Sequence, residues 1–64
     1  MELEKVVYET ILRLKDKDNL CLITDVMTEL HLTKDNDKDL LKAIAYLEHK
    51  KLIKKTALND ILVL

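Results

Sequence analysis

The chain has 64 residues, of which 48% are hydrophobic and 36% charged, and its formal net charge is −1 at pH 7. A chain of this length forms one domain, so we expect residues 1–64 to fold as a single unit with a small core. The apolar fraction excludes a disordered tail, no apolar run approaches the ~20 residues that span a bilayer, and the near-neutral charge means that nucleic-acid binding requires a local basic patch.

The first predicted element is a helix over residues 2–15. Its apolar side chains recur at helical spacing and form one stripe, made of Leu3, Val7, Ile11 and Leu14. Val6 lies on one side of this stripe, and Tyr8 and Leu12 lie on the other. Residues 15–19 contain no apolar side chain and are rich in turn formers, so the helix should end there.

A short apolar run over residues 20–23 predicts a small strand. The single cysteine, Cys21, lies in this run and cannot form an internal disulfide, and no targeting segment precedes the first helix. We therefore expect a cytoplasmic protein with a buried thiol. Thr24 predicts the N-cap of a second helix that runs to about His31, with Asp25 near the positive end of its dipole. The inner face of this helix is predicted to contain Val26, Met27 and Leu30.

The segment 37–51 has the clearest helical period in the chain, and Asn36 or Asp37 can cap it. Its inner face is predicted to contain Leu40, Ala43, Ile44, Leu47 and Lys51. The opposite face carries a row of mostly basic and small side chains, namely Lys38, Lys42, Ala45 and His49, with Tyr46 beside it. We expect this face to be free to contact a partner.

Two strand-like pieces follow, over residues 52–56 and 60–64, and the short connection 57–59 predicts a hairpin. The last piece is apolar on both faces. Its second face must therefore be covered by the first helix, by a partner chain or by nothing, and an exposed apolar edge would invite pairing with another strand.

This order of elements resembles the winged helix-turn-helix family. The closest local likeness is residues 40–53, where a leucine, a polar trio and a Leu-Ile pair occur as Leu47, residues 48–50 and residues 52–53. The resemblance implies an α+β, mostly helical fold with three helices, a short strand and a C-terminal β-hairpin wing. Two departures are visible: Lys51 stands where the family usually has glycine, and the third helix opens with carboxylates, which repel phosphates.

The resemblance implies a small DNA-binding protein that regulates transcription. Helix 37–51 would read the major groove through Lys38, Lys42, Tyr46 and His49, while Lys54 and Lys55 of the wing 52–64 hold phosphates. The alternative is a winged-helix protein-interaction module, a subunit or adaptor that binds no nucleic acid. We expect a homodimer, or a protein partner held through the C-terminal strand or the first helix, and no membrane contact.

Other sites have weaker support. The lysines at positions 50, 51, 54 and 55 can also serve to offset the helix dipole and to discourage edge pairing. The acidic run 35–39 lacks the glycine and the glutamate that a calcium loop needs at its sixth and twelfth positions. His31 and His49 have no neighbours at metal-ligand spacing. We therefore predict no metal, no cofactor and no enzymatic activity.

Overall fold

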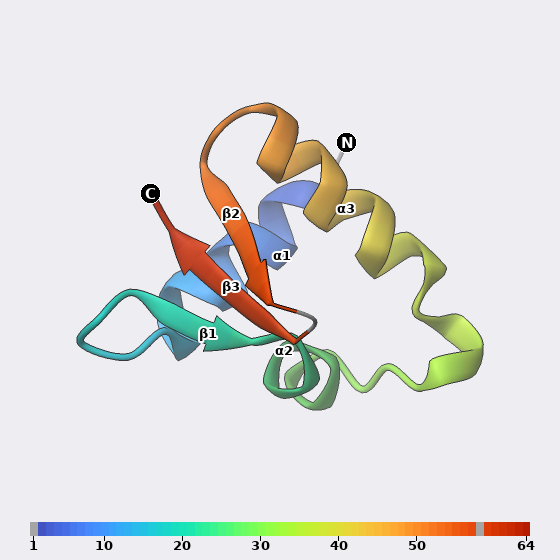
Figure 1. Cartoon of the computed structure of the whole chain (residues 1–64). Helices are drawn as coiled ribbons and strands as arrows, with labels where there is room; N and C mark the ends of the chain where they lie inside the picture. The colour runs from blue at the N-terminus through green and yellow to red at the C-terminus, as the bar shows by residue number, and fades with distance from the viewer. Residues whose placement is uncertain (1, 58) are drawn as a thin grey trace.

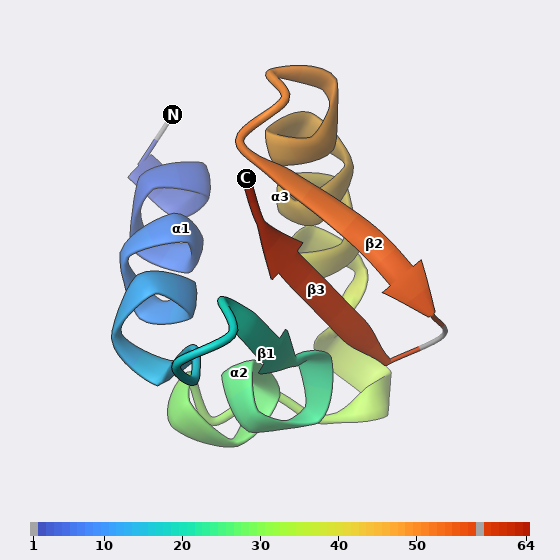
Figure 2. The ribbon, with the colours of Figure 1, turned by 60° about the vertical axis from the view of Figure 1, so that its left-hand side comes forward.

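The computed structural model describes residues 2–57 and 59–64, and within them helices and strands form one α+β body that is mostly helical, as predicted. The elements in chain order are α1 (Glu2–Leu14), β1 (Leu20–Leu22), α2 (Ile23–Glu29), a 3₁₀ turn (Lys34–Asn36), α3 (Lys38–His49), β2 (Ile53–Ala57) and β3 (Asp60–Val63). The sheet stands in front of α1 in Figure 1 and in front of α3 in Figure 2, where α2 closes the lower end of the body.

The sheet is antiparallel and its strand order is β1-β3-β2. The last strand, β3, is therefore central: Leu62 pairs with Leu20 of β1 on one side and with Lys54 of β2 on the other. Both edges of β3 are hydrogen-bonded, so the last strand does not present the exposed edge that would invite pairing with another chain. Element order and sheet order together are compatible with a winged-helix layout.

The core lies between the inner face of the sheet and the helices. Its most deeply buried side chains come from all three helices and from the two strands of the hairpin: Val7, Ile11, Val26, Leu40, Ile53 and Ile61. The predicted inner stripes of α1 and α3 are confirmed, since Leu40, Ala43, Ile44 and Leu47 are buried and the α1 stripe packs into the same cluster. Lys51 is the exception, because α3 ends at His49 and the Lys51 side chain is exposed.

In the described part of the chain, three residues take a positive φ although none is glycine: Asn19 (64°), His31 (58°) and Lys51 (62°). At the end of α3, the Lys51 N–H donates to the Glu48 carbonyl (2.9 Å) and the Leu52 N–H to the Leu47 carbonyl (3.1 Å). This pair of bonds is the Schellman motif, in which the residue after the C-cap adopts the left-handed conformation. Lys51 therefore takes the backbone angle of the family's glycine, at a steric cost of about 1 kcal/mol.

The same motif ends α2. The His31 N–H donates to the Thr28 carbonyl (3.2 Å) and the Leu32 N–H donates to the Met27 carbonyl (2.8 Å). Carbonyls in the last turn of both helices thus accept hydrogen bonds from within the chain. In each helix the left-handed position is taken by a residue other than glycine, His31 or Lys51.

The N-terminus of α2 differs from the prediction. The helix begins at Ile23, so Thr24 is its second residue rather than its cap, and Leu22 at the cap position offers no side-chain acceptor. Asn59, which lies in the turn of the hairpin, takes over the capping role: its carbonyl accepts from the Ile23 N–H (2.9 Å) and its Oδ1 from the Thr24 N–H (3.1 Å). Its Nδ2 also donates to the Thr24 hydroxyl (3.2 Å). The hairpin is therefore tied to α2 by a cap from a distant part of the chain.

The start of α3 shows a partial match. Asp37 occupies the N-cap position, as one of the two predicted candidates, but its side chain makes no capping hydrogen bond. Asn36 turns back instead, and its Oδ1 accepts from the backbone N–H (2.6 Å) and the hydroxyl (3.2 Å) of Thr33. The polar connection 33–37 is thereby ordered as a short 3₁₀ turn before the helix.

Candidate functional site: the outward face of α3

The outward face of α3 is the first candidate site, and its side chains lie where the helical period places them. All five predicted members are exposed: Lys38, Lys42, Ala45, Tyr46 and His49. Leu41 borders the row and is 46% exposed. We call the five predicted residues the α3 face. They cover a length of about 16 Å along the helix axis, given a rise of about 1.5 Å per residue.

Tyr46 and Lys50 form a pair at the C-terminal end of this face. The Lys50 ammonium lies 5.5 Å from the centroid of the Tyr46 ring, within the range of a cation–π contact. Both side chains are exposed. The contact keeps a positive charge over the Tyr46 ring, so this end of the α3 face offers a cation together with the phenol hydroxyl as a hydrogen-bond donor.

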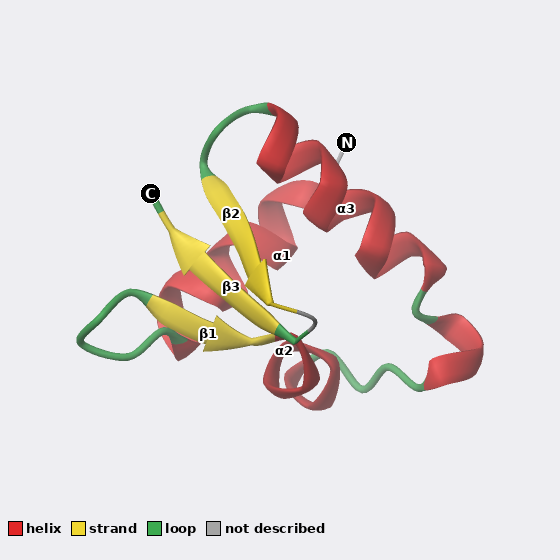
Figure 3. Cartoon of the chain, in the orientation of Figure 1, coloured by secondary structure: helices red, strands yellow, loops and turns green. Residues whose placement is uncertain are grey.

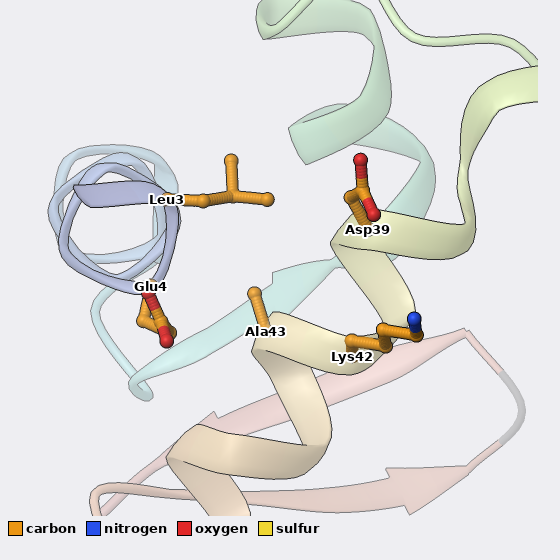
Figure 4. Close-up of a pocket in the computed structure, with 5 residues that line it drawn as sticks. All are labelled: Leu3, Glu4, Asp39, Lys42 and Ala43. Atoms are coloured by element: carbon orange, nitrogen blue, oxygen red, sulfur yellow. The ribbon is translucent and has the colours of Figure 1, made fainter. Parts of the chain in front are cut away.

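A carboxylate reduces the positive charge at the other end of the face. Asp39 and Lys42 both line a hollow of about 180 Å³ between α1 and α3, together with Leu3, Glu4 and Ala43. Figure 4 shows Leu3 and Ala43 pointing into the gap between the helices, whereas Lys42 points away from it. The hollow is smaller than the roughly 300 Å³ of the smallest ligand pockets. Lys42 therefore belongs to the outward surface rather than to a small-molecule site.

The two predicted wing lysines lie on opposite faces of the sheet. Ile53 is buried against the helices, and because side chains alternate along a strand, Lys54 points to the outer face, in register with Leu62. Lys55 lies on the side of the helices. Its backbone N–H donates a long hydrogen bond to the Glu48 carboxylate of α3 (3.4 Å). The structure thus brings Lys55 toward the α3 face and separates Lys54 from it.

Charge is distributed unevenly along the chain. Residues 38–64 contain six lysines and three carboxylates, a net charge of +3, whereas residues 1–37 contain five basic and nine acidic residues, a net charge of −4. All six lysines of the second part are exposed. Within the described residues none of them forms an ion pair, in contrast to Arg13, which pairs with Glu29 at 2.9 Å. The positive charge is therefore available to a partner.

Cys21 is buried, as predicted, and points into the core from β1. Burial raises the pKa of its thiol, and the nearby Asp25 and Asp16 carboxylates raise it further. The thiol donates weakly to the Leu22 carbonyl (3.6 Å). A thiol that is buried and kept protonated is a poor nucleophile, so Cys21 contributes to packing.

The sheet presents a second surface that the sequence pattern did not reveal. Leu20 and Leu22 flank buried Cys21 and point outward, with Leu62 beside Leu20. The ladder continues past the strand ends, since the Leu64 N–H donates to the Leu52 carbonyl (3.1 Å). We call this surface the leucine face, made of Leu20, Leu22, Leu52, Leu62 and Leu64. Side chains of a strand alternate between its two faces, so a buried Cys21 implies that Leu20 and Leu22 point outward. The sequence hid this alternation, because all four residues of the run 20–23 are apolar, as in a strand that is buried on both faces.

Comparison of the chain with protein-family models, with curated proteins and with solved structures gives no match. The likeness to winged helices therefore rests on element order, sheet order and the Schellman turn at Lys51. No helix in the described part of the chain combines the length and the apolar character that crossing a bilayer requires. Residues 2–57 and 59–64 likewise contain no group of three or more His, Cys, Asp or Glu side chains placed to hold a metal ion.

Proposed function

We propose that this chain is a small winged-helix protein that binds duplex DNA through the α3 face, in the manner of a transcriptional regulator. The observation that carries the proposal is the concentration of exposed lysines on α3 and on its junction with β2, none of which forms an ion pair with another described residue. A duplex is recognised first through its phosphates, and lysines that are not engaged within the protein can replace the counterions there.

The shape of α3 suits this role. A single helix fits the major groove, which is about 12 Å wide. Lys38 and Lys42 lie one turn apart on the outward side, and Ala45 allows the helix axis to come close to the base edges. Tyr46 and His49 supply donors toward the C-terminal end. The Asp39 carboxylate lies at the margin of this surface and limits the orientations in which the helix can approach phosphates.

The structure changes the expected part played by the hairpin. Asn59 holds the end of the hairpin against α2, so contact with DNA by a projecting wing tip forms no part of the proposal. Leu58, which belongs to the predicted tip 57–59, lies outside the described residues. In the proposed complex Lys55 contacts phosphates beside α3, and Lys54, on the other face of the sheet, does not.

The test is fluorescence anisotropy of a labelled duplex of random sequence at low salt. The double substitution Lys38→Ala and Lys42→Ala should weaken binding to all sequences and lower the salt dependence by about two phosphate contacts. The matched control is Lys5→Ala with Lys17→Ala, which removes two exposed lysines that lie outside α3. Equal losses in the two double variants would contradict the assignment to α3.

The second candidate function is a protein-interaction module, and the observation that favours it is the leucine face. Monomeric proteins rarely expose a contiguous apolar patch of this kind. If the folded protein binds no duplex at low salt, the protein-interaction function of the leucine face replaces the DNA-binding proposal. The two candidates use different surfaces, the α3 face and the leucine face, so substitutions on each surface separate them.

A further inference from the structure

The leucine face is open in the described part of the chain. Leu20, Leu22 and Leu52 are 39%, 41% and 38% exposed, and Leu64 is 64% exposed. Leu62 lies at the centre, between Leu20 on β1 and Lys54 on β2. In Figure 3, α1 lies behind the sheet, α2 lies below it and α3 lies beside it, and no described segment crosses in front of it.

We propose that a second copy of this chain covers the leucine face, in a two-fold symmetric dimer with sheet packed on sheet. Such an interface uses the same patch on both subunits and must be complementary to itself. The leucines meet this condition, because an apolar surface is removed from water equally well by its own copy. The inference is independent of DNA binding.

Charges at the margins of the leucine face are complementary. On the β1 side the face borders a hollow of about 320 Å³, whose lining includes Leu20, Leu22 and the carboxylates of Asp16, Asp25 and Asp60. On the β2 side it ends at Lys54, which is exposed. A two-fold axis that puts Lys54 of one copy into the acidic hollow of the other produces the same contact twice. The leucines of the two copies then lie between these contacts.

Other surfaces fit a second copy less well. The α3 face is basic and would repel itself. The open edge of β2 carries Lys54 and Lys55 and is approached by the Glu48 carboxylate, which discourages strand addition, while β1 is only three residues long. On α1, Val6 and Leu12 are exposed, but positions six residues apart lie about 120° apart around a helix, given about 100° per residue. They therefore do not form one patch.

Size-exclusion chromatography with light scattering, over a range of protein concentrations, tests the proposal. The wild type should show twice the monomer mass of 7.5 kDa, and Leu20→Lys should return it to the monomer mass. Leu62→Lys is a second variant at the centre of the face. The control is Leu41→Lys, an equally exposed leucine on α3, which should leave the dimer intact. Circular dichroism confirms that each variant is folded.

A charge exchange distinguishes a second copy from any other occupant. Lys54→Glu should weaken the dimer, because the new carboxylate faces the acidic hollow of the other copy. Asp60→Lys should weaken association of the wild type but strengthen it in the Lys54→Glu background. This reversal of sign requires the two positions to face each other. A wild type that remains monomeric at all concentrations, or an Asp60→Lys effect of the same sign in both backgrounds, would overturn the proposal.

Discussion

Replacement of Asn59 by alanine removes the cap that the hairpin supplies to α2. Two side-chain hydrogen bonds disappear, one from the Thr24 N–H (3.1 Å) and one to the Thr24 hydroxyl (3.2 Å). The Asn59 carbonyl still accepts from the Ile23 N–H. Loss of a capping side chain together with a partly exposed hydrogen bond reduces the free energy of unfolding by about 1.5 kcal/mol.

Thermal and urea denaturation followed by circular dichroism measure this change. In a domain of this size, 1.5 kcal/mol corresponds to a fall in Tm of about 6 to 12 °C. Two companion variants divide the effect. Asn59→Asp keeps the acceptor for the Thr24 N–H and should retain most of the stability, whereas Thr24→Val removes only the hydroxyl and should lose about 0.5 kcal/mol.

The reasoning about the distant cap would be refuted by two results. One is an Asn59→Ala variant whose unfolding free energy lies within about 0.3 kcal/mol of the wild type, which is the usual range for neutral surface changes. The other is an Asn59→Asp variant that loses as much stability as the alanine variant, because that loss could not come from the missing acceptor.

Two further predictions concern Lys51 and Cys21. Lys51 has a φ of 62°, which glycine adopts without strain and a β-branched residue adopts with more. Lys51→Gly should therefore stabilise the fold by up to about 1 kcal/mol, and Lys51→Val should destabilise it by a similar amount, as measured by urea denaturation. A change of stability of the same sign in both variants would contradict backbone strain at Lys51. Cys21 should react with a thiol reagent far more slowly in the folded protein than in denaturant, and equal rates would show that it is accessible. Because the folded state raises the pKa of this thiol, the unfolded state loses its proton first as the pH rises. Stability should therefore fall through the pH range above the ordinary thiol pKa, and Cys21→Ala should lessen that fall.

The sequence was sufficient to predict features that depend on local period. The apolar stripes of α1 and α3 follow from spacing alone, and the turn after α1 follows from its polar composition. There the Asp16 carboxylate accepts from the backbone N–H groups of Asp18 (2.8 Å) and Leu20 (3.1 Å). Comparison with the family's glycine left two outcomes open at Lys51, a strained backbone angle or a different turn, and the structure has the positive φ.

What could not be predicted depends on contacts between distant segments. The cap on α2 comes from Asn59, which lies 35 residues further along the chain than Thr24. The prediction from neighbouring residues instead placed Thr24 itself at the N-cap. The pairing of β1 with β3 made the last strand central rather than open. Packing of the sheet on the helices then decided which face is the inner one, so that Lys54, Leu20 and Leu22 point outward.

The most direct test of the central proposal is the salt dependence of duplex affinity. If Lys38, Lys42 and Lys55 each neutralise one phosphate, the slope of log K against log salt is about −2.7 for one protomer. Affinity should then fall about 40-fold between about 50 and about 200 mM salt. A slope near zero, or no binding of any duplex at the lowest salt by a folded protein, would contradict the proposal that the α3 face binds DNA.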